Sequence, residues 1–183
     1  MHPDHVELSV TLRLYPFKYR NKMGIPPADR VMLMCYNMGN LTNPATKNSI
    51  LDPSEMSKYL SGSPTYPLPV DMALPLFSWF AWFRERAFKG LVYPEDVEKA
   101  GWKINNGRIS IAKDTVMNGR QFFAGDQLRQ EETTPEDLFK ARKLLGSSLD
   151  VHHPARLALF HLDSLILSKY NTHALEDIFD GDR

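Results

Sequence analysis

The chain has 183 residues, of which 43% are apolar, and its 22 basic and 22 acidic residues leave no net charge. A chain of this length can bury one sizeable core, so we expect a single domain over residues 1–183. Neutrality without a block of Lys and Arg argues against nucleic acid or a membrane surface as the main partner. No signal peptide or transmembrane segment is recognised, so the localisation stays unknown.

The first predicted strand runs from Glu7 to Tyr15, where apolar and polar residues alternate. Strict alternation is typical of a strand with one buried face. Arg13 and Tyr15 lie on its polar face. They are candidates for ligand contact at the mouth of a barrel, with an interior polar network as the alternative.

A second strand is predicted from Arg30 to Met38, after the break at Pro26-Pro27. Its apolar run does not alternate, which indicates a strand covered on both faces, as in a parallel sheet. The carboxyl ends of such strands carry the chemistry in strand-helix barrels. Tyr36 and Asn37 are therefore candidate binding residues, because a phenol and a carboxamide supply donors and acceptors. A structural tyrosine with a partnered hydroxyl is the alternative.

A helix is predicted from Pro53 to about Leu60, because Asp52 can accept from the first-turn amides and Glu55 completes a capping box. The next apolar run, from Pro69 to Phe83, is predicted as a strand that leads into a site-forming loop. Its aromatic residues include Phe77, Trp79, Phe80, Trp82 and Phe83. Such a cluster can stack on sugar rings or form a core, and Trp79 is the preferred stacking candidate.

After Gly90 we expect an α+β insertion at about residues 90–148. It begins with a short helix near Pro94 to Ala100. Two strands, 108–116 and 120–123, are predicted to form a hairpin, because Asn118-Gly119 is a strong turn signal. A helix then follows Thr134 and is expected to stop at Gly146.

The last predicted elements are a strand from Arg156 to Leu162 and a helix from about Thr172 to Phe179. His161 and Asp163 alternate onto one face, where they can act as an acid/base pair, bind a metal or form a structural pair. Two ligands do not define a metal site, so none is predicted. Motifs of nucleotide-binding proteins, serine hydrolases and zinc proteases are absent, and no cofactor is expected.

Strands that alternate with capped helices predict an α/β fold with parallel pairing. Four strand-helix units make half of an eight-stranded barrel, with a small antiparallel hairpin inserted before the last strand. A half barrel leaves two open sheet edges and an uncovered apolar face. A second copy of the chain or a missing amino-terminal half is expected to close it.

This order of motifs resembles the later half of chitinase-like family-18 glycoside hydrolases, whose sixth strand carries Met-x-Tyr-Asp. The segment Met34-Cys35-Tyr36-Asn37 matches it, with Asn37 in place of the acid. Residues 68–77 are similar to the seventh strand, and 160–163 would be the eighth. The family's acid motif, Asp-x-x-Asp-x-Asp-x-Glu, has no counterpart here, so the proton donor is missing.

The resemblance implies a partial TIM-type barrel that binds an N-acetylated glycan and is catalytically inactive as this isolated chain. No catalytic residue is assigned. The alternative is a non-catalytic interaction module in which two half barrels pair as a homodimer. A self-contained enzyme that uses Asp71 or Asp163 with His161 is the weakest hypothesis, because no second acid stands at a matched position.

Overall fold

The computed structural model describes residues 6–62, 65–148, 155–161 and 164–180. The chain forms two compact units. The first, here called the parallel unit, comprises Met1–Met38, Leu51–Leu76 and Thr134–Arg183. The second, the antiparallel unit, comprises Gly39–Ile50 and Phe77–Thr133. The organisation as a single domain with an insertion at about 90–148 remains a prediction.

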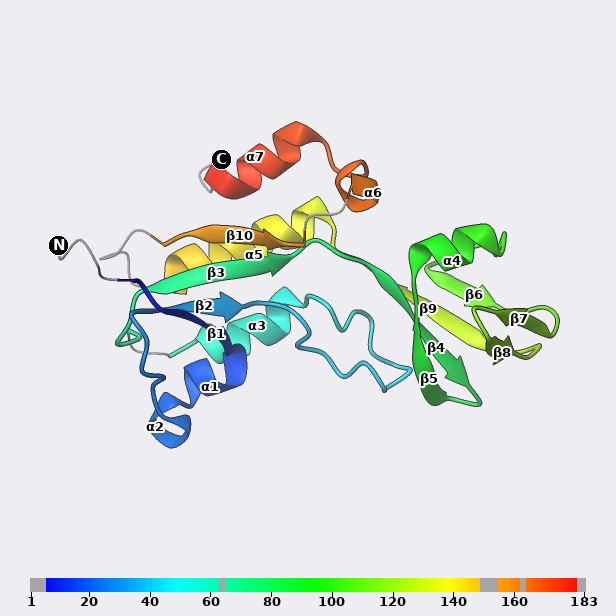
Figure 1. The fold of residues 1–183 in the computed structure, drawn as a ribbon, viewed down its shortest axis with the longest axis horizontal. Coiled ribbons are helices and arrows are strands. Elements are labelled where there is room, and N and C mark those ends of the chain that lie inside the picture. The colour runs from blue at the N-terminus through cyan, green and yellow to red at the C-terminus, as the bar shows by residue number, and fades with distance from the viewer. Residues whose placement is uncertain (1–5, 63–64, 149–154, 162–163, 181–183) are drawn as a thin grey trace. The chain divides into compact units, whose positions relative to one another are not determined.

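The parallel unit is built on a four-stranded sheet (Figure 1). Its strands are β1 (Ser9–Arg13), β2 (Arg30–Met34), β3 (Val70–Pro75) and β10 (Leu157–Phe160). They lie in the order β1-β2-β3-β10 and all neighbours pair in parallel. The predicted α/β class with parallel pairing is therefore confirmed.

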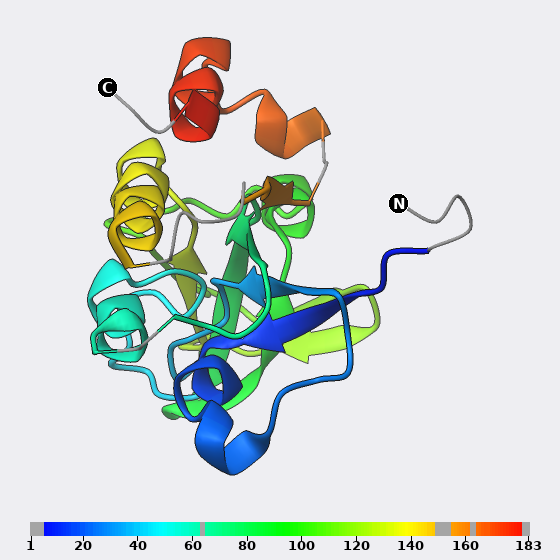
Figure 2. The same cartoon turned by 90° about the vertical axis from the view of Figure 1, so that its left-hand side faces the viewer.

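Helices follow the strands, and the longer ones lie along one side of this sheet (Figure 2). They are α1 (Leu14–Lys18), α2 (Arg20–Met23), α3 (Pro53–Leu60), α5 (Pro135–Ser148), α6 (Ser164–Leu167) and α7 (Thr172–Asp180). Burial along β2 alternates accordingly: Val31 and Leu33 are fully buried, whereas Met32 and Met34 are half-buried. This alternation identifies the helix-covered face of the sheet.

Helix α3 forms as its capping signals predicted. The Asp52 carboxylate accepts hydrogen bonds from the backbone N–H groups of Ser54 at 2.9 Å and Glu55 at 3.3 Å. Pro53 occupies the first turn, where its missing N–H costs nothing. Burial of the carboxylate opposes ionisation, but these hydrogen bonds outweigh it, so the pKa of Asp52 is lowered.

An ionic network joins the amino-terminal ends of the parallel strands. Arg30 donates from Nε and Nη2 to the two carboxylate oxygens of Asp71, at 2.6 and 2.7 Å. The same carboxylate accepts the backbone N–H of Arg156 at 2.8 Å. Exposed Glu7 pairs with Arg30 and Arg156 at 3.3 and 2.9 Å. The Arg30–Asp71 pair is buried, so each charge depends on the other.

The antiparallel unit contains a second four-stranded sheet, in the order β5-β4-β9-β6. Its elements are β4 (Trp79–Arg84), β5 (Ala87–Val92), α4 (Pro94–Lys99), β6 (Arg108–Ser110), β7 (Thr115–Met117), β8 (Arg120–Phe122) and β9 (Gln127–Glu131). Strands β7 and β8 form a separate hairpin. The core of the antiparallel unit includes Phe80, Trp82, Val92, Phe122 and Leu128.

Two predicted strands are shorter than expected. Strand β1 ends at Arg13, and Tyr15 lies in α1 with its ring 4.7 Å from that of Tyr19. A helix forms here instead of a longer strand because Leu14 and Phe17, three residues apart, are both buried on the inner side of α1. Strand β2 ends at Met34 rather than Met38.

The apolar run from Pro69 to Phe83 is not one strand followed by a loop. It divides into β3, in the parallel unit, and β4, in the antiparallel unit. Strand β4 pairs with β5 on one side and β9 on the other. Most of the aromatic residues of this run therefore lie in or beside a central antiparallel strand. A buried antiparallel strand and a buried parallel strand favour the same residue types, so the sequence does not distinguish them.

The insertion also differs in detail from the prediction. Residues 108–116 form two strands, β6 and β7, and β6 pairs with β9. The hairpin turn itself is confirmed: Asn118 and Gly119 adopt φ of 50° and 71°. Helix α5 runs through Gly146 to Ser148, because that glycine does not take the left-handed conformation that ends a helix.

We predict that Asp71→Asn lowers the free energy of unfolding by about 3 kcal/mol, because Arg30 would keep a buried charge without a counter-ion. Chemical denaturation of the purified chain measures this change. Glu7→Gln is the matched control, since it removes an exposed carboxylate from the same network and should cost less than about 1 kcal/mol. Equal losses in the two variants would contradict the prediction.

Candidate functional site

The carboxyl ends of the parallel strands present a set of polar and aromatic side chains. Arg13 is the last residue of β1, and Tyr36 lies two residues beyond β2. Phe160 ends β10 and is followed by His161. Because the strands are parallel, these residues share one edge of the sheet, here called the carboxyl edge.

Tyr36 and Phe160 form an aromatic pair across this edge. Their ring centroids are 5.4 Å apart and their planes differ by 9°. Phe160 pairs with Pro75 of β3, so the two rings flank the end of the intervening strand. The Phe160 side chain is 47% exposed, which leaves an apolar aromatic surface open to a ligand.

Burial raises the pKa of the Tyr36 phenol, and the nearby positive charge of Arg13 opposes that rise. The phenol therefore stays protonated over the physiological range and can donate a hydrogen bond there. Arg13 is exposed at the end of β1 and adds a permanent donor. The two side chains are suited to recognise carbonyl and hydroxyl oxygens.

Asn37 follows Tyr36 in the left-handed conformation, with φ of 53°. Asn is among the few side chains that adopt it readily. The residue is exposed and turns the chain away from the sheet edge.

His161 is exposed, and its ring contacts that of Phe160 edge-on, with centroids 5.4 Å apart. Asp163 lies outside the described residues. Phe160 was not predicted as a site residue, because its contact with Tyr36 depends on the order of the strands in the sheet, which the sequence does not give. Because β10 ends at Phe160, this ring meets Tyr36 at the carboxyl edge.

Tyr15 and Asp71 lie elsewhere in the parallel unit. Tyr15 is 47% exposed on α1, where it contacts Tyr19. Asp71 is buried near the amino-terminal end of β3, with both carboxylate oxygens occupied by Arg30. An acid with this environment is a structural counter-ion.

Trp79, the preferred stacking residue, lies at the start of β4 in the antiparallel unit. Its indole N–H donates to the buried carboxylate of Glu131 at 3.2 Å, and its ring packs at a tilt on Phe77 at 5.1 Å. The side chain is half-buried. The carboxylate therefore fixes the indole while part of its face remains open.

Glu131 holds more than the indole. It also accepts the backbone N–H of Ser49 at 2.8 Å and the Ser49 hydroxyl. Its other oxygen accepts from Arg129 Nε at 2.8 Å. Arg129 in turn donates to the backbone carbonyls of Asn43 at 2.7 Å and Leu41 at 3.1 Å. This buried network anchors the segment Gly39–Ile50 to strand β9.

The other aromatic residues of this run belong to the core. Phe77, Phe80, Trp82 and Phe83 are all buried. Trp82 donates to Asp126 at 2.9 Å, and Arg84 binds the same carboxylate. Burial opposes ionisation of Asp126, but these hydrogen bonds outweigh it and lower its pKa. Trp79 is therefore the member of the cluster that is available for stacking.

Within the described ranges, no group of three or more His, Cys, Asp or Glu side chains is placed to hold a metal ion. Cys35 is fully buried, and burial raises the pKa of its thiol well above the usual range. No helix in the described part of the chain is long and apolar enough to cross a membrane. The described side chains at the carboxyl edge supply aromatic rings, a guanidinium, a phenol and an imidazole.

No family model matches the chain, and no curated protein matches it. The structure is similar to a chitinase from Chromobacterium violaceum, with a TM-score of 0.55 and 14% identity over 97% of this chain and 56% of that one. A glycoside hydrolase family 18 N-acetylglucosaminidase from Paenibacillus barengoltzii gives a TM-score of 0.47 and 12% identity, over 97% of this chain and 57% of the enzyme.

The spore cortex-lytic enzyme SleL of Bacillus cereus gives a TM-score of 0.43 and 13% identity over 92% of this chain and 42% of that one. The chain spans about half the length of the solved structures that it resembles. The likeness to the Chromobacterium chitinase confirms the predicted resemblance at the level of fold.

We predict that Glu131→Gln lowers the free energy of unfolding by about 3 kcal/mol, because Arg129 is left as a buried charge without its counter-ion. Hydrogen exchange should show faster exchange at the Ser49 amide, whose acceptor is weakened. Glu132→Gln is the control, since this neighbouring side chain is exposed and should change neither measurement. Unchanged Ser49 protection in Glu131→Gln would refute the anchoring role.

Proposed function

We propose that this chain is a carbohydrate-binding half barrel that recognises an N-acetylated glycan at its carboxyl edge and does not itself cleave it. The aromatic pair of Tyr36 and Phe160 carries the proposal. The exposed ring of Phe160 offers the flat apolar surface on which the C–H face of a sugar packs. The likeness of the fold to a chitinase supports this class of ligand.

The side chains around the pair fit the polar groups of such a sugar. The Tyr36 hydroxyl can donate to an acetamido carbonyl, while Arg13 can donate to ring hydroxyls. Asn37 and His161 are proposed as further contacts at the same edge. Trp79 is proposed as a stacking residue of the antiparallel unit. Tyr15 and Asp163 remain predictions from the sequence.

The acids support the proposal that the chain does not cleave the glycan. Glycoside hydrolysis needs a carboxylic acid that is protonated at the working pH and can reach the glycosidic oxygen. The motif that supplies it in family-18 enzymes is absent from this sequence. Among the described residues, the buried acids Asp71, Asp126 and Glu131 are all engaged by arginines. The proposed activity is therefore binding.

A second candidate function is self-assembly through paired half barrels. In the described part of the chain, β1 and β10 form the two edges of the parallel sheet and carry no further strand. The longer helices lie on one side of this sheet (Figure 2), and the opposite face carries half-buried Met32 and Met34 beside the exposed Thr11 and Arg13 of β1. Open edges beside accessible methionines favour association.

We expect Tyr36→Phe to weaken binding of chitotriose by roughly threefold to tenfold, the effect of losing one hydrogen bond of about 1 kcal/mol. Phe160→Ala should weaken it further, because the apolar surface is lost as well. Isothermal titration calorimetry with the purified chain measures both. Tyr19→Phe removes a hydroxyl from an exposed tyrosine of the same unit and should leave the affinity unchanged.

Absence of binding by the wild-type chain at millimolar sugar would overturn the proposal. The wild-type chain should also leave a fluorogenic N-acetylglucosaminide intact. Turnover that survives further purification and responds to Tyr36→Phe would show instead that the chain has its own proton donor.

The assembly candidate predicts a dimer in size-exclusion chromatography with light scattering at micromolar concentration. Met32→Glu should give a monomer, because it places a charge on the face that the partner would cover. Met23→Glu changes an exposed methionine at the end of α2 and should remain dimeric. Circular dichroism verifies that both variants are folded. A monomeric wild-type chain at all concentrations would exclude this function.

A further inference from the structure

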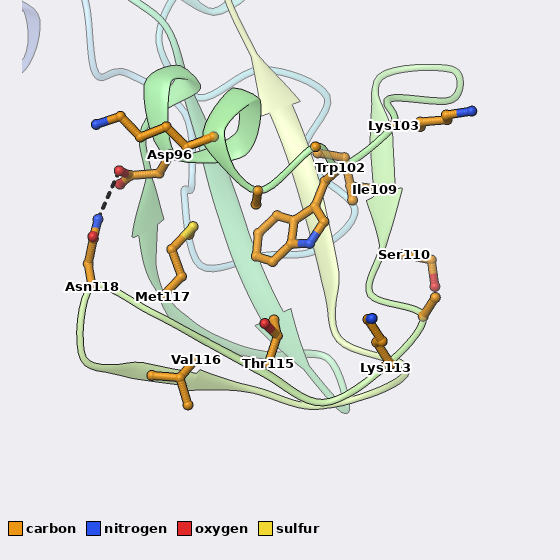
Figure 3. A pocket seen from close by; sticks show the side chains of 14 residues that line it. Asp96, Trp102, Lys103, Ile109, Ser110, Lys113, Thr115, Val116, Met117 and Asn118 are labelled. Carbon is orange, nitrogen blue, oxygen red and sulfur yellow. Dashed lines mark hydrogen bonds between the residues drawn. The ribbon is translucent and has the colours of Figure 1, made fainter.

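The antiparallel unit contains a cavity of about 770 Å³ that shares no residue with the carboxyl edge. It lies between α4, the loop that follows this helix, and strands β6 and β7 (Figure 3). Its volume falls within the range of about 300–1,000 Å³ that small-molecule sites occupy. Nothing in the carbohydrate-binding proposal for Tyr36 and Phe160 uses it.

Trp102 lines this cavity and lies at the centre of the lining side chains in Figure 3. The indole is half-buried and rests edge-on against Phe122, with ring centroids 5.1 Å apart and planes at 68°. Phe122 belongs to the buried core of the unit. The core thus supports one side of the indole, and the rest of its surface is available to a ligand.

The charges around the cavity are mainly positive. Lys99, Lys103 and Lys113 line it, against one acid, Asp96. None of the three lysines forms an ion pair with any described residue. Figure 3 shows Lys103 directed away from the cavity. Lys113 lines the same cavity as Trp102, so its ammonium group is available to a ligand that contacts the indole.

The single acid of the lining already has a partner. Asp96 accepts a hydrogen bond from the Asn118 carboxamide at 2.8 Å (Figure 3). This bond links α4 to the turn of the β7–β8 hairpin, where Asn118 and Gly119 both have positive φ. It fixes one wall of the cavity without a ligand, which reduces the ordering cost of binding.

We infer that this cavity binds an anionic saccharide, with a sugar ring against Trp102 and a carboxylate of the sugar beside Lys113. A pyranose has one apolar C–H face that suits an indole, and an ammonium group attracts a carboxylate without demanding a bidentate geometry. The hydroxyls of Ser110 and Thr115 line the same cavity and match sugar hydroxyls. The ligand class differs from the neutral glycan proposed for the carboxyl edge.

The composition of the lining favours a sugar over a nucleotide. Among the described residues that line the cavity, Trp102 is the only aromatic one, so a base would find no second ring there to enclose it. The remaining apolar contacts come from side chains such as Ile109 and Met117. One aromatic face with surrounding hydroxyls and a cation corresponds to a ring that is apolar on one side and polar at its rim.

The test is calorimetric titration of the intact chain with trigalacturonic acid, with neutral cellotriose and with adenosine monophosphate. The trigalacturonate should bind tightest, and its affinity should fall as salt is added, because the lysines are exposed. Lys113→Gln should weaken this binding by roughly threefold to fivefold, the effect of one solvent-exposed charge pair. The Trp102 indole N–H resonance should shift on titration.

Lys89→Gln is the matched control, because Lys89 is an exposed lysine of β5 outside the cavity lining. Tyr36→Phe should also bind trigalacturonate like the wild type, which separates this inference from the function proposed for the carboxyl edge. Equal weakening by Lys113→Gln and Lys89→Gln would mean diffuse charge attraction and overturn the inference. Tighter binding of cellotriose or of adenosine monophosphate, or no binding at all, would also overturn it.

Discussion

Parallel pairing of β1, β2, β3 and β10 is the constraint from which the arrangement of the parallel unit follows. Parallel neighbours need a long return connection, and here the helices that make it lie along one side of the sheet. All strand ends then meet at one edge, which brings Arg13 within electrostatic reach of Tyr36 and stacks Tyr36 on Phe160. The same constraint leaves the other face of the sheet without helices.

Both units depend on a buried carboxylate that binds several groups at once. Asp71 takes two donors from Arg30 and the backbone N–H of Arg156. Glu131 takes Arg129, Ser49 and Trp79. A single buried ion would be unstable, but a carboxylate whose oxygens are all occupied can hold separate segments in fixed positions. In each unit the network joins segments that are distant in sequence.

The sequence predicts best where a local signal decides the structure. Asp52 and Pro53 determine the start of α3, and Asn118-Gly119 determines a turn, because each acts through its own neighbours. Strand β9 escaped prediction because Arg129 and Glu131 look like surface residues. They are buried only because they neutralise each other, and that pairing depends on contacts that the sequence does not display.

The same distinction applies to the candidate site. Tyr36 could be predicted because it follows an apolar run at a strand end. Phe160 could not, because its role depends on where β10 ends and on which strand lies between it and Tyr36. Trp79 and Trp82 are the same residue type in the same apolar run, yet Trp79 is half-buried and Trp82 lies in the core. Burial is decided by the pairing of β4 with both of its neighbours.

The state of the acids connects the fold to the proposed function. A general acid must hold its proton near neutral pH, which requires an environment that raises its pKa. The structure does the opposite at Asp126, where the hydrogen bonds from Arg84, the Phe123 backbone and Trp82 outweigh burial and lower the pKa. Asp71 and Glu131 are bound by Arg30 and Arg129. These three carboxylates therefore hold the architecture together, while exposed rings and exposed cationic side chains are left for the proposed binding.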